Sequence, residues 1–133
     1  MSQTYLMIKP EAVRAGHWPE ILRLLLQNRF QVRRVEMRRL GTDLARTFYA
    51  EHEARPFFGA LIDYITSGDV LTVGVEGEDA VARLRVLVGA TDPARATPGT
   101  LRYMFGTSLQ ENAVHASDSD ASAAREMALI FPR

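Results

Sequence analysis

The sequence predicts an α+β sandwich in which helices cover one face of a four-stranded antiparallel sheet. Two observations lead to this class: four short apolar segments have the character of strands, and helical patterns alternate with them. The predicted order, β-α-β-α-α-β-α-loop-α-β, fits a split βαβ arrangement of the ferredoxin-like type. A parallel, flavodoxin-like sheet is the alternative, but it needs more strands than this pattern provides. The length of 133 residues suits a single domain over 1–133.

The first half of the chain supplies two of these strands. Residues 3–9 form a short apolar run that ends at Pro10, and residues 30–40 form a second strand with many basic side chains. Between them, residues 19–28 have the apolar spacing of a helix, with Pro19 in its first turn. The basic strand would also suit a nucleic-acid contact. A solvated strand face is favoured because no aromatic side chains are interleaved with its arginines.

The middle of the chain continues the alternation of helices and strands. Helices are predicted at 42–50, 57–66 and 78–88, and a buried strand is predicted at 70–75.

The last third of the chain begins with a segment rich in turn residues. Residues 89–112 are predicted as a long loop with a short helix near 99–104. A loop of this length inside a compact domain is usually functional or disordered. Residues 119–131 are predicted as an alanine-rich helix capped by Ser119 or Asp120, with the fourth strand around 128–131.

The composition argues against several classes of function. Sixteen basic and sixteen acidic residues cancel, so no net field attracts nucleic acid or a membrane surface. The absence of cysteine excludes disulfides, thiolate chemistry and cysteine-based zinc sites, and it favours a cytoplasmic location. No basic and apolar leader is seen, and no apolar run approaches the roughly 20 residues of a membrane helix. We therefore expect a soluble protein.

The basic residues are divided unevenly between the two types. Fifteen are arginine and only one, Lys9, is lysine. Arginine cannot replace lysine where a compact point charge must fit a tight phosphate pocket. Lys9 is therefore a candidate phosphate ligand, although chance survival in an arginine-biased sequence explains it equally well.

His115 is the candidate for covalent chemistry. A single histidine is more often structural than catalytic, but Ser117, Asp118 and Ser119 lie beside this one, and Glu126 follows eleven residues later. A nucleophilic imidazole needs one ring nitrogen free and the other held by an acceptor. Because a phosphorylated imidazole transfers its phosphate readily, histidine suits a reversible carrier.

Candidate partners for a phosphate and a base come from distant segments. Arg55, Arg85 and Arg102 are candidate phosphate ligands beside Lys9, although any one of them alone is more often a surface charge. The long loop would allow Arg102 to reach the histidine. Phe57 or Phe58 is a candidate for stacking on a base, and core packing is the alternative for each. No glycine-rich P-loop or protein-kinase motif is present. From the residues alone, the function is a phosphohistidine carrier or a nucleotide binder.

Five motifs occur in order from about residue 4 to 131: Met7–Val13, Arg55–Phe58, Gly89–Pro93, Pro98–Arg102 and Asn112–Ser119. Together they resemble the nucleoside diphosphate kinase family. The resemblance implies the ferredoxin-like fold and reversible transfer of the terminal phosphate from a nucleoside triphosphate, such as ATP, to a nucleoside diphosphate. It also implies Mg²⁺ carried by the nucleotide phosphates with few or no protein ligands, and a homo-oligomer, a hexamer or a tetramer built from dimers.

The same resemblance assigns the catalytic group. His115 matches the phosphorylated residue, and Ser117 and Glu126 match the pair that orients its imidazole. Lys9 matches a lysine that contacts phosphate and a sugar hydroxyl, and Tyr49 matches a tyrosine lining the same pocket.

The nucleotide-binding group is assigned in the same way. Phe57 matches a residue stacked on one face of the base, and Leu109 lies where an aliphatic side chain covers the other face. Asn112 matches an amide that binds the sugar hydroxyls. The phosphate ligands implied by the resemblance are Arg85, Thr91 and Arg102.

The sequence departs from the family pattern at several positions. Glu11-Ala12 replaces the usual Asp-Gly, and Ala116 replaces the glycine after the histidine, a change that matters if that position needs a positive φ. Ala15 and Tyr103-Met104 also differ from common family residues, and they bear on assembly more than on chemistry. Two alternatives to an active enzyme remain: a regulatory nucleotide binder that has lost catalysis, and a nucleic-acid module using the basic strand.

Overall fold

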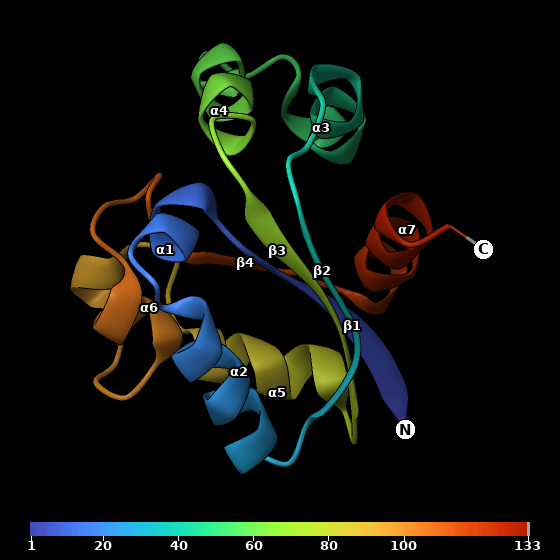
Figure 1. The fold of residues 1–133 in the computed structure, drawn as a ribbon, viewed down its shortest axis with the longest axis vertical. Coiled ribbons are helices and arrows are strands. Elements are labelled where there is room, and N and C mark those ends of the chain that lie inside the picture. Colours follow the sequence, from blue (N-terminus) through green and yellow to red (C-terminus); the bar gives the residue numbers. More distant parts are fainter. Residues whose placement is uncertain (133) are drawn as a thin grey trace.

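The fold is built on one antiparallel sheet, seen here in a computed structural model that describes residues 1–132 (Figure 1). The strand order is β2-β3-β1-β4, and every neighbouring pair is antiparallel. This is the predicted ferredoxin-like topology, which is confirmed. The strands are β1 (Ser2–Ile8), β2 (Gln31–Arg38), β3 (Val70–Gly77) and β4 (Val114–Ala116).

Within residues 1–132, seven α-helices connect and cover the strands. The five predicted between residues 19 and 104 are found within about two residues of the expected bounds. One was missed, because Pro10 ends the first strand and also opens a short helix at its first position. None of the helices within residues 1–132 is long and apolar enough to cross a membrane. The helices are α1 (Pro10–Arg14), α2 (Trp18–Gln27), α3 (Thr42–Phe48), α4 (Phe58–Ile65), α5 (Ala80–Val88), α6 (Leu101–Phe105) and α7 (Asp120–Ile130).

The fourth strand is not where the sequence predicted it. The expected strand at 128–131 is wrong, because α7 continues to Ile130 and its apolar end packs into the core with Phe131. The fourth strand is β4, which pairs with β1 through the register Leu6–Ala116, Met7–His115 and Ile8–Val114. Residues 128–130 therefore belong to a helix, Phe131 follows its end, and the fourth strand carries the candidate histidine.

Two apolar clusters occupy the two faces of the sheet. Leu6 and Ile8 of β1 point into a cluster shared with α2 and α5, whereas Tyr5 and Met7 point into a second cluster. Figure 1 shows α2 and α5 on one side and α7 on the other. The expected helical cover on one face is present, and α7 in addition covers part of the other face. This two-sided burial explains why β1 is a continuous apolar run.

Gly74 of β3 faces the side chain of Met127 on α7. A Cβ built on Gly74 would lie 2.9 Å from the Met127 Cε atom and 3.1 Å from the Arg34 Cβ atom. The Met127 Cε atom is the end of a flexible side chain and can shift, whereas the Arg34 Cβ atom on β2 would have to move by a few tenths of an ångström. The glycine therefore leaves room for the Met127 and Arg34 side chains.

Candidate active site

His115 lies in the middle of β4, at the edge of the sheet. Its ring is packed among the rings of Tyr5, Phe48 and Tyr49, at centroid distances of 6.0, 5.1 and 6.2 Å. The side chain is still 21% exposed. The imidazole is therefore held firmly by aromatic neighbours while part of it reaches solvent.

Hydrogen bonds to Glu126 determine which ring nitrogen of His115 is available. The Nε2 atom lies 2.8 Å from the Glu126 Oε1 atom, and the Ser117 hydroxyl donates to the same oxygen at 2.7 Å. A carboxylate oxygen accepts both bonds, so Nε2 carries the ring proton and Nδ1 keeps its lone pair. The geometry thus provides one nucleophilic nitrogen and one that is held in place.

Glu126 is placed by the connection between β4 and α7. The predicted cap at Ser119 is confirmed, since its hydroxyl oxygen accepts from the Ser122 backbone N–H at 3.0 Å. The helix therefore begins soon after β4. Its inner face carries Glu126 to the histidine, and the Glu126 and Ser117 side chains are both buried.

Two arginines lie beside the histidine on the backbone of β4. Arg102 donates to the Val114 carbonyl at 2.9 Å, and Arg85 donates to the Ala116 carbonyl at 3.4 Å. The carbonyls on both sides of His115 are thus bound by guanidinium groups. These contacts place two cations on the backbone that flanks His115, one from α6 and one from α5.

The charge of this arginine pair is not neutralised. Within residues 1–132, neither Arg85 nor Arg102 forms an ion pair with a carboxylate. Burial and the nearby Arg85 charge lower the pKa of Arg102 to about 10. The buried Nε atom of Arg102 has no hydrogen-bond partner. An anion such as a phosphate beside the two guanidinium groups would offset their mutual repulsion.

Lys9 is buried and bonded to another predicted ligand. It is only 8% exposed, and its Nζ atom donates to the Asn112 Oδ1 atom at 2.8 Å. The amide of Asn112 donates in turn to the Thr91 carbonyl at 2.9 Å. Burial, followed by the Arg102 charge, lowers the pKa of Lys9 to about 8, against an opposing effect of Glu11. The structure thus joins Lys9, Asn112 and Thr91 in one hydrogen-bonded chain.

The remaining predicted residues are one aromatic neighbour of the histidine and two exposed apolar side chains. Tyr49 packs edge-on to His115, and burial together with the Glu126 charge raises the pKa of its phenol. Phe57 is 49% exposed and lies next to the His52 ring, with centroids 5.6 Å apart. Leu109 is 63% exposed in the turn that follows α6. Both apolar side chains are therefore accessible to a ligand.

The methyl group of Ala116 fits without backbone strain. Among residues 1–132, only Arg29, Asp79 and Ala113 are non-glycine residues with positive φ. Ala116 is a regular strand residue, so the departure at this position does not distort the strand that carries His115.

Sequence reasoning missed Glu11 and Tyr64 as neighbours of the site. The Lys9 Nζ atom lies 5.8 Å from the centre of the Tyr64 ring, and the Tyr64 hydroxyl donates to Glu11. Only the replacement of the family aspartate by Glu11 could have drawn attention to that position. Nothing in the sequence around Tyr64 indicates a contact with the site.

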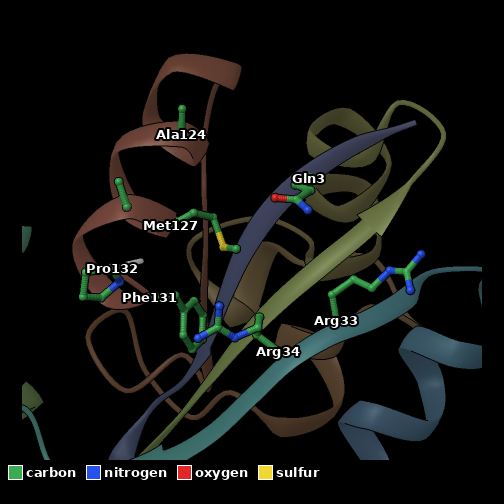
Figure 2. Close-up of a pocket in the computed structure, with 8 residues that line it drawn as sticks. Gln3, Arg33, Arg34, Ala124, Met127, Phe131 and Pro132 are labelled. Carbon is green, nitrogen blue, oxygen red and sulfur yellow. The ribbon is translucent and has the colours of Figure 1, made fainter.

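A separate hollow lies away from the histidine. It has a volume of about 620 Å³ and lies between β1, β2 and the side of α7 that carries Met127 (Figure 2). None of the predicted site residues lines it. The lining residues are Gln3, Arg33, Arg34, Ala124, Met127, Ala128, Phe131 and Pro132.

The buried ammonium of Lys9 predicts a specific pH dependence of stability. Below about pH 8 both folded and unfolded states are protonated at Lys9, and the full cost of burying the charge applies. Between about pH 8 and the unfolded value of 10.5, the unfolded state binds more protons, so the contribution of Lys9 to stability rises with pH. Urea unfolding of wild type and Lys9→Met at pH 7.5 and 9.5 should show wild type gaining about 2 kcal/mol relative to the variant. Equal pH profiles for the two proteins would contradict burial of a charged Lys9.

Comparisons with known proteins agree with the fold and with the motifs. A model of the family described as nucleoside diphosphate kinase matches residues 2–133. The chain is 47% identical to a nucleoside diphosphate kinase of Deinococcus radiodurans, over 98% of this chain and 95% of the relative. It is also 47% identical to one from Rubrobacter xylanophilus, over 98% of both chains.

Solved structures give the same result. The nucleoside diphosphate kinase of Halobacterium salinarum in complex with CDP has a TM-score of 0.97 and 38% identity, covering 99% of this chain and 88% of that one. The Aquifex aeolicus nucleoside diphosphate kinase has a TM-score of 0.95 and 38% identity, covering 98% and 94%. With the family model spanning nearly the whole sequence, this chain belongs to the nucleoside diphosphate kinase family.

Proposed function

We propose that the chain catalyses reversible transfer of the terminal phosphate between nucleoside triphosphates and diphosphates, with His115 as the phosphorylated residue. The observation that carries the assignment is the free Nδ1 atom of an imidazole whose Nε2 atom is held by Glu126 at 2.8 Å. The unneutralised guanidinium groups of Arg85 and Arg102 donate to the backbone carbonyls of the two residues that flank His115. A phosphate bound by these cations is proposed to lie close to the nucleophile.

The proposed step is an in-line displacement. The Nδ1 lone pair forms a bond to the γ-phosphorus, the bond from that phosphorus to the β–γ bridging oxygen breaks, and the nucleoside diphosphate leaves. The imidazole gains positive charge as the new bond forms. The buried Glu126 carboxylate stabilises that charge through the Nε2–H bond. A second diphosphate then takes the phosphate by the reverse step.

The cofactor Mg²⁺ is proposed to enter with the nucleotide. Within residues 1–132, no group of three or more histidine and acidic side chains is placed to hold a metal ion. The side chains at the proposed phosphate site, Lys9, Arg85 and Arg102, are cations that suit phosphate oxygens instead. When bound to those oxygens, Mg²⁺ would neutralise part of the phosphate charge.

The direct test is phosphorylation of the protein itself. After incubation with ATP and Mg²⁺ and removal of nucleotide, intact mass should increase by one phosphoryl group, and peptide mapping should place it on His115. Addition of any nucleoside diphosphate should return the mass to its starting value. Binding of ATP without this mass change would instead support a regulatory protein that has lost catalysis.

The exposed apolar pair predicts broad tolerance of the base. Phe57 and Leu109 are apolar, so their contacts do not depend on which hydrogen-bonding groups a base carries. Every base also has a face on which an aromatic ring can stack. The relative from Halobacterium salinarum was solved with the pyrimidine nucleotide CDP. We expect rates for purine and pyrimidine diphosphates to agree within about tenfold, which corresponds to about 1.4 kcal/mol.

The sugar is expected to be recognised more strictly than the base. Lys9 and Asn112 are proposed to bind the sugar hydroxyls, so diphosphates lacking the 3′-hydroxyl should react at least tenfold more slowly, because buried polar groups would be left unpaired. Steady-state rates with matched 3′-deoxy substrates measure this effect. Equal rates with and without the hydroxyl would contradict the assigned sugar contacts.

We also propose that the chain forms a homo-oligomer, a hexamer or a tetramer built from dimers. In support, β2 lies at an edge of the sheet, and Val35 and Met37 on it are 47% and 40% exposed. The hollow in Figure 2 adjoins the same strand. Light scattering at micromolar concentration should give a multiple of the 14.9 kDa chain mass, and a monomer mass would contradict the proposal. The cytoplasmic location stays a prediction.

A further inference from the structure

The backbone next to the histidine contains an unusual turn. The Val114 N–H donates to the Asn112 carbonyl at 3.0 Å, and the residue between them, Ala113, has a φ of 76°. A hydrogen bond from residue i+2 to residue i across a positive φ defines the classic γ-turn, which is rare and strained. Ala113 is fully buried and is not a glycine, so the surrounding structure must hold it in this conformation.

The turn separates two functional parts of the site. Asn112, which binds Lys9, lies directly before Ala113, and His115 follows two residues after it. A change in the dihedral angles of Ala113 would therefore shift the histidine relative to the Lys9–Asn112 pair. Such a shift matters because misplacing a reacting group by about 1 Å can cost on the order of a hundredfold in rate.

The segment after β1 holds Ala113 on both sides. The Ala113 N–H donates to the Glu11 Oε1 atom at 3.0 Å, and the Ala113 carbonyl accepts from the Lys9 backbone N–H at 2.8 Å. The other carboxylate oxygen of Glu11 accepts from the hydroxyl of Tyr64, which extends from α4. Glu11 is thus the side chain that satisfies the buried N–H of the strained residue, and Tyr64 orients it.

We propose that Glu11 and Tyr64 are positioning residues that hold the Ala113 turn and so fix His115 relative to Lys9 and Asn112. Neither side chain touches the proposed reacting atoms. Their effect should therefore appear in the rate of His115 phosphorylation and not in nucleotide affinity. The proposal rests on His115 being the phosphorylated residue.

The test compares phosphorylation rates by rapid quench at saturating ATP, well below the melting temperature. Glu11→Ala should phosphorylate roughly tenfold to a hundredfold more slowly, with the ATP dissociation constant changed less than about threefold. Glu11→Gln should keep at least about a third of the rate, because its amide oxygen can accept from Ala113 while its NH₂ group donates to Tyr64. Glu20→Ala, which removes an exposed carboxylate on α2, is the matched control and should be silent.

If the strain at Ala113 is removed, the hydrogen bond from Ala113 to Glu11 should no longer be needed for a fast reaction. Glycine adopts a positive φ without steric cost, so in an Ala113→Gly background the turn should persist on its two backbone hydrogen bonds. There, Glu11→Ala should cost less than about threefold, a non-additivity that a general loss of stability would not produce. In the original protein, Tyr64→Phe should lower the phosphorylation rate by less than Glu11→Ala does. Tyr103→Phe, at an exposed position, is the control and should keep the wild-type rate.

A readout independent of catalysis completes the test. The Ala113 amide should exchange with solvent at least tenfold faster in Glu11→Ala than in wild type, measured by NMR. The proposal would be overturned if Glu11→Ala were phosphorylated at the wild-type rate and its Ala113 amide were as well protected as in wild type. It would also be overturned if Glu11→Ala lowered the phosphorylation rate equally in the original protein and in the Ala113→Gly protein. If wild-type protein is never phosphorylated on His115, the proposed function is refuted. The exchange experiment would still test whether Glu11 holds the Ala113 turn.

Discussion

Replacing His115 with alanine is expected to lower nucleoside diphosphate kinase activity by roughly a thousandfold or more. The reason is that a covalent route loses its only acceptor for the phosphate when the nucleophile is removed. The cations proposed to bind phosphate come from other elements, so ATP affinity should change less than about threefold. A coupled assay with ATP and a diphosphate measures the rate, and calorimetry measures the affinity.

The structure provides a control and a way to interpret any loss of stability. His115→Ala leaves the buried Glu126 carboxylate with only the Ser117 hydroxyl as partner, which should cost about 1–3 kcal/mol of stability. Rates must therefore be measured well below the melting temperature. His17→Ala removes a ring that packs on Phe105, with centroids 4.8 Å apart, and should keep full activity. Substantial turnover by His115→Ala, or phosphate found on Ser117, would refute the assignment.

The sequence was sufficient for most of the fold because most elements are long enough to carry a pattern. β1 and β3 are runs of seven and eight residues, buried along most of their length, and the helices show apolar spacing. β4 has only three residues and a histidine at its centre, so it has no periodicity of its own. Its pairing with β1 is a tertiary effect. The consecutive apolar residues Leu129, Ile130 and Phe131 have the pattern of a buried strand. In the structure they are instead the end of α7 and the residue after it, which pack onto the second apolar cluster.

The candidate site could be proposed from the sequence as a set of residues but not as a geometry. The family resemblance was enough to name His115 and Glu126 as candidates, whereas the choice between Nε2 and Nδ1 depends on a hydrogen bond that only the fold defines. The guanidinium contacts to the carbonyls of Val114 and Ala116 have no sequence signature. The bond between Glu11 and Ala113 spans 102 residues and is likewise invisible in a motif. Contacts of this kind depend on tertiary packing, which local patterns do not encode.

The lone lysine is the second position where a single substitution should have a large effect. Fifteen of the sixteen basic residues are arginine, so this sequence accepts arginine almost everywhere else. At position 9, however, the ammonium is buried, bonded to Asn112 at 2.8 Å and set against the Tyr64 ring. Arg102 lies close enough for its charge to lower the pKa of Lys9. A longer, planar guanidinium group cannot occupy this space without moving Asn112 or Tyr64.

We therefore expect Lys9→Arg to lower turnover at least tenfold even though the charge is kept. The physical reason is geometric, since the ammonium is proposed to reach both a phosphate and the sugar, and a displaced cation would stabilise the transition state less well. Arg14→Lys, which makes the opposite exchange at an exposed position of α1, is the matched control and should be silent. Turnover is compared at a temperature where both variants are folded, as shown by circular dichroism. A Lys9→Arg protein that turns over at the wild-type rate would mean that the lysine is an accident of composition and that charge alone is needed at this position.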